Sequence, residues 1–128
     1  MIQSPYQKYQ QLSAQTATPL QLVIMLYDGA IRFVKQGITG LEHNNYEAAN
    51  NNFCKAESIL HELVASLNFE FPVAKQLLTI YEYMLHQLIQ ANVYKQVGNA
   101  QEVVEHLVEL RQSWKQLSGG SAAIQQQA

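Results

Sequence analysis

The chain has 128 residues, of which 48% are hydrophobic and only 14% are charged, and its formal net charge is −2 at pH 7. This length fits a single domain that buries roughly two-thirds of the surface of its unfolded chain. Because the 8 Lys and Arg residues are scattered and form no basic stripe, the sequence argues against binding to a nucleic-acid phosphate backbone.

Residues 1–15 are predicted to form a short N-terminal helical segment. Ile2, Tyr6, Tyr9 and Leu12 recur at spacings of four, three and three residues, as on one face of a helix. Helices shorter than about 12–15 residues are marginal in water, so the segment is expected to be ordered only where its two tyrosines dock on the rest of the protein. A frayed terminus is the alternative interpretation.

The longest helical stretch is predicted from Pro19 to His43, with Thr18 as its N-cap and Pro19 at a position that needs no N–H donor. Projection at about 100° per residue places one set of apolar residues on a core face: Val23, Tyr27, Ala30, Val34, Ile38 and Leu41. Leu22, Leu26 and Phe33 widen the apolar arc to roughly 200°, more than one core face needs.

Glycines recur on this second face, at positions 29, 37 and 40. Each costs a helix interior about 1 kcal/mol relative to Ala, so a compensating contact is expected. A glycine-lined surface lets another backbone approach closely. Two interpretations stay open: a groove for a segment of a partner protein, and close packing of the chain's own next helix.

Two later helices are each predicted to bury a single seam. One spans about Tyr46–Leu67, where the Asn44-Asn45 pair ends the preceding helix and offers a cap. The other begins at Asn99, after Gly98 as a breaker, and ends before Gly119. Their seams have the four-three spacing of a bundle: Ala49, Phe53, Ala56, Leu60, Leu63 and Leu67, and Ala100, Val103, Leu107, Leu110, Trp114 and Leu117.

The helix between these two is predicted from Pro72 to Val97, after a turn whose Phe69 and Phe71 are expected to cover the end of the bundle. Its central stripe is Leu77, Tyr81, Met84, Leu88 and Ala91, flanked by Ile80 on one side and by Leu78, Leu85 and Ile89 on the other. Its apolar arc is near 180°, which again exceeds one seam.

Together these elements predict an all-α fold. Residues 16–118 are expected to form an antiparallel up-down four-helix bundle. The short N-terminal segment precedes it, and the Gln-rich residues 119–128 are predicted to be a disordered tail because they contain too few apolar side chains to pack.

The sequence holds little that indicates catalysis. Glu57/His61, Glu82/His86 and Glu102/His106 share an i,i+4 spacing that differs from the Glu-x-x-His of di-iron bundles, and they are interpreted as solvated helix pairs rather than metal ligands. Asp28 and Arg32 are expected to pair in the same way. No phosphate loop or nucleophile motif is found. The prediction is a protein that is not an enzyme, with no metal and no cofactor.

Three further expectations concern the surroundings of the protein. The single cysteine, Cys54, rules out an internal disulfide and is expected to be a small buried hydrophobe. No signal peptide or apolar run of about 20 residues is present, so the predicted location is the cytosol without membrane insertion. Tyr83 and Tyr94, with Gln87 and Gln90 between them, form a row that is either exposed or contacts a partner.

Several blocks in order along the chain resemble one family, the flagellin-specific secretion chaperones of the FliS type. The blocks extend over residues 5–114: Pro5-Tyr6 with Tyr9, Thr16 to Pro19, Met25 to Phe33, Tyr81 to Met84, Ala91-Asn92, and Glu109 to Arg111 followed by Trp114. The resemblance implies a cytosolic four-helix bundle that binds the disordered C-terminal region of flagellin, prevents its premature polymerisation and escorts it to the cytosolic domain of the flagellar type III export gate. Tyr6 and Tyr9 would then belong to a displaceable cover over the flagellin-binding surface.

The extra apolar arcs of the first and third predicted helices give this resemblance a physical basis. The predicted client-binding residues are Leu22, Leu26, Gly29 and Phe33 with Leu78, Leu85 and Ile89. The client would fold into these grooves as short helices. The alternative is a self-associating bundle without a flagellin client, in which the same arcs close a homodimer.

Overall fold

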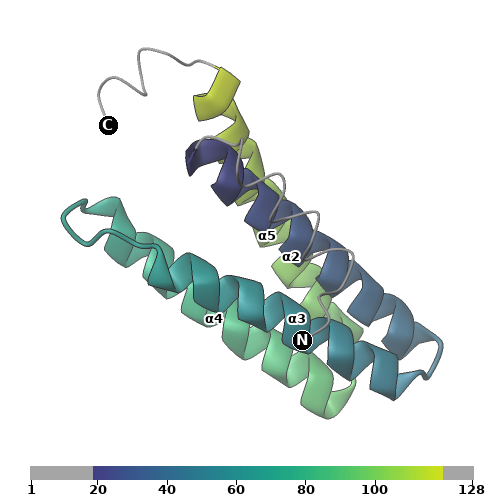
Figure 1. The fold of residues 1–128 in the computed structure, drawn as a ribbon. Coiled ribbons are helices and arrows are strands. Elements are labelled where there is room, and N and C mark those ends of the chain that lie inside the picture. The colour runs from purple at the N-terminus through teal and green to yellow at the C-terminus, as the bar shows by residue number, and fades with distance from the viewer. Residues whose placement is uncertain (1–18, 120–128) are drawn as a thin grey trace, which may run out of the picture.

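The computed structural model describes residues 19–119, which form four helices: α2 (Pro19–Glu42), α3 (Tyr46–Ala65), α4 (Val73–Tyr94) and α5 (Val97–Gly119) (Figure 1). Helix α2 packs against α3 and α5, and α4 packs against the same two helices. Short turns join consecutive helices. This arrangement confirms the predicted all-α four-helix bundle. The predicted N-terminal segment with Tyr6 and Tyr9, and the predicted tail, lie outside the described residues.

The core consists of the predicted seams. The central stripes of α2, α3 and α4 and the first half of the α5 seam are buried, except that Val23, Ile38 and Leu67 are half-buried. The largest fully buried side chains are Tyr27, Tyr81, Phe53, Leu60, Leu63, Met84, Leu88, Leu107, Val34 and Val103. Burial of the α5 seam decreases toward its C-terminal end, where Leu110 and Trp114 are half-buried and Leu117 is exposed. In Figure 1, the start of α2 and the end of α5 lie well apart from the α3–α4 turn, so the helices converge at the opposite end of the bundle.

Helices α2 and α3 approach each other most closely at two glycines. A Cβ atom added at Gly37 would lie 2.5 Å from Cε1 of Phe53, and one added at Gly40 would lie 2.8 Å from the backbone nitrogen of Ala49. Both distances are shorter than real Cβ contacts, so the helices can pack at this separation only with glycine at these positions. For Gly37 and Gly40, the structure therefore decides between the two interpretations in favour of packing within the chain.

The turns follow the predicted cap at one place and differ from it at another. Asn45 caps α3, because its Oδ1 accepts a hydrogen bond from the Ala48 N–H at 3.2 Å. The predicted break at Gly98 is wrong: α5 already begins at Val97. Lys95 instead takes the left-handed conformation that ends α4, with φ 57°. Its ammonium group lies 4.9 Å from the centre of the Tyr46 ring and donates a hydrogen bond to the Asn92 carbonyl at 2.9 Å.

Two predictions about burial are also wrong. Phe69 and Phe71 are 55% and 53% exposed, because the turn closes locally on Asn68 instead of folding back over the bundle. The Asn68 side chain accepts a hydrogen bond from the Glu70 N–H at 3.0 Å, and its carbonyl accepts one from the Phe71 N–H at 3.1 Å. Cys54 is exposed as well, since it lies on the solvent side of α3.

Candidate functional site

The first set of predicted site residues, Leu22, Leu26, Gly29 and Phe33, forms a row on α2 that we call the α2 row. Leu22 and Leu26 are half-buried, Gly29 is buried, and Phe33 is only 9% exposed. The ammonium group of Lys55, on α3, lies 5.4 Å from the centre of the Phe33 ring. This contact, with the Gly37–Phe53 approach, places the α2 row on the flank of α2 that borders α3.

The second set, Leu78, Leu85 and Ile89, forms a row on α4 that we call the α4 row. Leu78 and Leu85 are half-buried and Ile89 is 46% exposed. Asn92 shares this flank of the helix, and its Nδ2 donates a hydrogen bond to Oδ1 of Asn50 on α3 at 2.8 Å. The α4 row therefore also borders α3, but on the side away from α2.

The two rows thus flank one helix and do not merge into a single groove. Each leaves apolar side chains uncovered beside the polar outer face of α3, an arrangement that suits the apolar face of an amphipathic partner segment. The sequence analysis missed Val93, which is 60% exposed and extends the α4 row by one turn. Its signal was available, because it lies four residues beyond Ile89.

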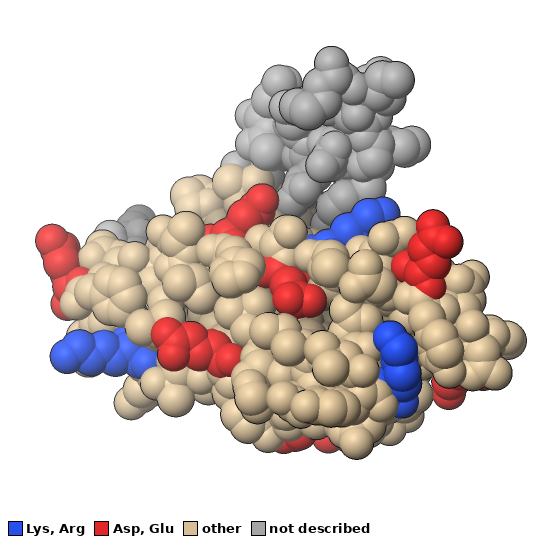
Figure 2. All heavy atoms as spheres, turned by 90° about the horizontal axis from the view of Figure 1, so that it is seen from below, with Lys and Arg blue, Asp and Glu red and all other residues tan. Residues whose placement is uncertain are grey.

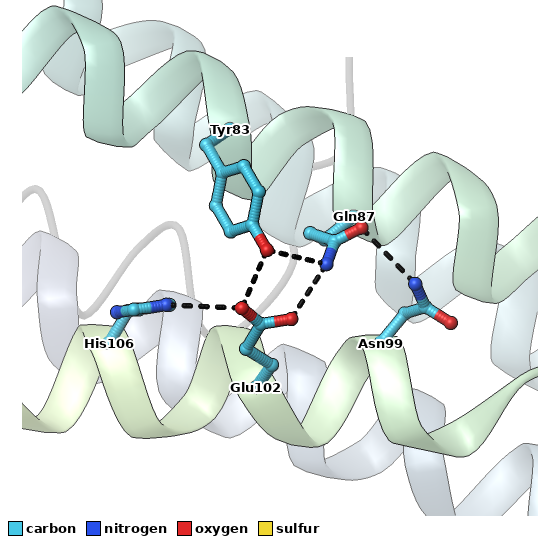
Figure 3. Close-up of polar contacts among 5 residues, drawn as sticks. All are labelled: Tyr83, Gln87, Asn99, Glu102 and His106. Atoms are coloured by element: carbon cyan, nitrogen blue, oxygen red, sulfur yellow. Dashed lines mark hydrogen bonds and ion pairs between the residues drawn. The ribbon is translucent and has the colours of Figure 1, made fainter.

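A polar network joins α4 to α5 on the opposite side of α4 (Figure 3). The Glu102 carboxylate accepts hydrogen bonds from the Tyr83 hydroxyl and from Gln87 Nε2, each at 2.6 Å, and His106 Nε2 lies 3.5 Å from it. Asn99 Nδ2 donates to Oε1 of Gln87 at 3.1 Å. These donors, Tyr83 first and then Gln87, lower the pKa of Glu102, whereas the carboxylate raises the pKa of Tyr83.

This network settles two expectations from the sequence. Glu102 and His106 do form an i,i+4 helix pair, as predicted. Tyr83 and Gln87, however, donate hydrogen bonds to Glu102 on α5. Two of the four residues in the tyrosine and amide row therefore make contacts within the bundle. Within residues 19–119, no group of three or more His, Cys, Asp or Glu side chains is placed to hold a metal ion.

The predicted partner of Asp28 was wrong. The Asp28 carboxylate accepts a hydrogen bond from Nε of Arg111 on α5, whereas the Arg32 guanidinium lies 6.0 Å from the Phe33 ring centre. A contact between residues 83 positions apart leaves no trace in the local spacing that favoured Arg32. Its effect is to tie the middle of α2 to the last turns of α5.

A buried pair of hydroxyls joins the two helices that lie diagonally across the bundle. The Tyr27 and Tyr81 oxygens are 2.6 Å apart, and the two side chains are fully or almost fully buried. Burial is the main cause that raises the pKa of both groups. Both phenols therefore remain protonated in the physiological range and hold α2 and α4 in register rather than taking part in acid–base chemistry.

Comparison of the sequence with known proteins shows the family of the chain. A family model described as flagellar protein FliS matches residues 1–121. The chain belongs to the FliS family. Its FliS relatives include proteins named flagellar secretion chaperone FliS from Bacillus subtilis, 37% identical over 90% of this chain and 86% of the relative, and from Vibrio cholerae, 32% identical over 84% and 79%. The relative from Salmonella typhimurium is 32% identical over 86% of this chain and 87% of its own.

The surface of this FliS-family chain carries little charge. On the face in Figure 2, Lys and Arg side chains stand apart from one another with Asp and Glu side chains among them, and no basic stripe crosses it. Between residues 19 and 119, none of the helices is long and apolar enough to cross a membrane.

Proposed function

We propose that this FliS-family protein is a cytosolic flagellar export chaperone. It binds the disordered C-terminal region of flagellin, its client, prevents premature polymerisation and escorts the client to the cytosolic domain of the flagellar type III export gate. The single observation that supports client binding best is the uncovered apolar α4 row, bordered by α3, in a chain whose relatives are named flagellar secretion chaperones. No catalytic step is part of this function.

Binding would proceed by coupled folding of the client. The client forms short amphipathic helices whose apolar side chains contact the α4 row and the accessible members of the α2 row, Leu22 and Leu26. Gly29 and Phe33 follow them along α2 and are buried. Burial of apolar surface, at about 25 cal/mol per Å², offsets the entropy lost when the client becomes ordered. We propose that the segment with Tyr6 and Tyr9 covers part of this surface when no client is bound.

The test is isothermal titration with a peptide from the C-terminal end of the same organism's flagellin. Ile89→Glu places a charge in the α4 row and is expected to weaken binding by at least about tenfold, because the carboxylate would be desolvated against apolar side chains. Val108→Glu is the matched control, since Val108 is 47% exposed on α5, almost the same as Ile89. Equal binding by the wild type and by Ile89→Glu would remove the α4 row from the client site.

Two further results separate the proposed function from its alternatives. Deletion of residues 1–15 should tighten peptide binding if Tyr6 and Tyr9 act as a cover. A dimeric mass at high concentration without client, combined with no binding heat at several temperatures, would favour the self-associating bundle instead.

A further inference from the structure

Glu57 of α3 lies beside the α4 row. The hydrogen bond between Asn50 and Asn92 fixes the level at which the antiparallel helices α3 and α4 meet. Seven residues are about two helical turns, so Glu57 on α3 and Leu85 on α4 occupy the same level and the same flank, two turns from this bond. Both residues are half-buried.

The Glu57 carboxylate has no hydrogen bond or ion pair with any residue between 19 and 119. The Glu102 carboxylate, in contrast, accepts hydrogen bonds from Tyr83 and Gln87. Burial raises the pKa of Glu57, and the charge of His61, one turn further along α3, opposes this change. A carboxylate that loses water without gaining a donor destabilises the fold. A hydrogen-bond donor or a cation from outside residues 19–119 would therefore stabilise the Glu57 carboxylate.

No cation on the neighbouring helices lies close to Glu57. Lys55 lies on the other flank of α3, at Phe33, and Lys95 lies over Tyr46 at the far end of the pair. Lys75 is ten residues before Leu85, about 15 Å along α4. The titratable residues of α4 nearest in sequence to Leu85 are Glu82, Tyr83 and His86, and all three are exposed; the Tyr83 hydroxyl bonds Glu102 on α5. The α3–α4 flank therefore combines an apolar row with a carboxylate that pairs with no Lys or Arg side chain of residues 19–119 and has only His61 nearby as a possible cation.

We propose that Glu57 is a specificity-determining residue that binds a Lys or Arg side chain of the client segment seated on the α4 row. This inference rests on the proposed function and adds the chemistry of the client: an amphipathic helix with a cation next to the apolar side chains that contact Leu85 and Ile89. A charge-assisted hydrogen bond shielded by the bound client is stronger than one at an open surface. A client with an acidic or apolar residue there would leave the carboxylate desolvated and unpaired, so it would be rejected.

The experiment is titration of the full-length chain with the same flagellin peptide, comparing Glu57→Gln with Glu62→Gln. Glu62 is exposed on the same helix and serves as the matched control. Glu57→Gln is expected to lower the affinity about tenfold and to reduce its dependence on salt, because one charge-assisted contact is lost. Glu62→Gln is expected to bind as the wild type does.

A second arm identifies the cation. Each Lys or Arg of the peptide is replaced by Gln in turn, and one replacement is expected to weaken binding to the wild type but not to Glu57→Gln, as coupled residues do in a double-mutant cycle. Three results would overturn the inference and leave the proposed function intact. They are an unchanged affinity of Glu57→Gln for the peptide, an equal loss of affinity in Glu57→Gln and Glu62→Gln, and the absence of any peptide residue coupled to Glu57. Failure of the wild type to bind the peptide would instead overturn the proposed function. Glu57→Gln is expected to fold, since it replaces a half-buried carboxylate, which has no hydrogen bond to the described residues, by a neutral side chain of nearly the same shape.

Discussion

The close approach of α2 to α3 makes a prediction that can be calculated from the structure. In Gly40→Ala, the new Cβ would meet the Ala49 backbone nitrogen at 2.8 Å and both Ala49 Cα and the Asn45 carbonyl oxygen at 3.0 Å. All three are backbone atoms of the α3 start, which cannot rotate away as a side chain can. Overpacking of this kind costs about 1–3 kcal/mol. The higher helix propensity of Ala returns about 1 kcal/mol, so a net loss of up to about 2 kcal/mol is expected.

Gly98→Ala provides the matched control within the same chain. Gly98 also lies in a helix, but a Cβ added there meets nothing within 4 Å. Because only the propensity gain applies, this variant is expected to be more stable than the wild type by about 0.5–1 kcal/mol. Urea unfolding followed by circular dichroism at 222 nm measures both values. Gly40→Ala as stable as Gly98→Ala would refute the argument that glycine sets the distance between α2 and α3.

Two further predictions concern the polar contacts between helices. Tyr81→Phe is expected to lower the free energy of unfolding by about 1 kcal/mol, because the buried Tyr27 hydroxyl loses one of its two side-chain partners and keeps Trp114; an unchanged urea midpoint would contradict this. The pKa of Glu102 is lowered in the fold, so its ionised form adds stability above the ordinary carboxyl pKa, and this stability is lost as pH falls through the lower folded value. The stability difference between wild type and Glu102→Gln should therefore shrink from pH 7 to pH 3, as thermal unfolding would show; a constant difference would count against this contact.

The seams were predictable because they depend on local periodicity. Phe53 and Leu88 lie at the centre of the apolar face of their helices, and this face is buried whichever helix it packs against. The helical spacing of apolar residues alone therefore places them in the core. The Asn45 cap was predictable for the same reason, since its donor is only three residues away. The break at Gly98 was not, because the left-handed residue that ends α4 is Lys95, a lysine, rather than the glycine that usually takes this conformation.

The candidate site also has features that could be predicted from the sequence and features that could not. The α4 row was predicted from helical spacing, and its members remain half-buried or exposed. Its relation to α3 was not predictable, because the level at which the two helices meet, marked by the Asn50–Asn92 bond, joins residues 42 positions apart in the sequence. The special position of Glu57 follows only from that level: by spacing alone it was one of several equivalent Glu–His pairs.

By itself, the sequence determined the helices, their apolar faces and the excess of apolar arc on α2 and α4, since each depends on residues within a few turns of one another. It also carried the blocks that resemble the FliS family. Only the tertiary structure decided that Gly37 and Gly40 serve internal packing, that Asp28 pairs with Arg111, and that Glu57 lies beside an apolar row without a hydrogen bond to any residue from 19 to 119. Each of these depends on distances between helices, and such distances result from the packing of the whole bundle rather than from any one segment.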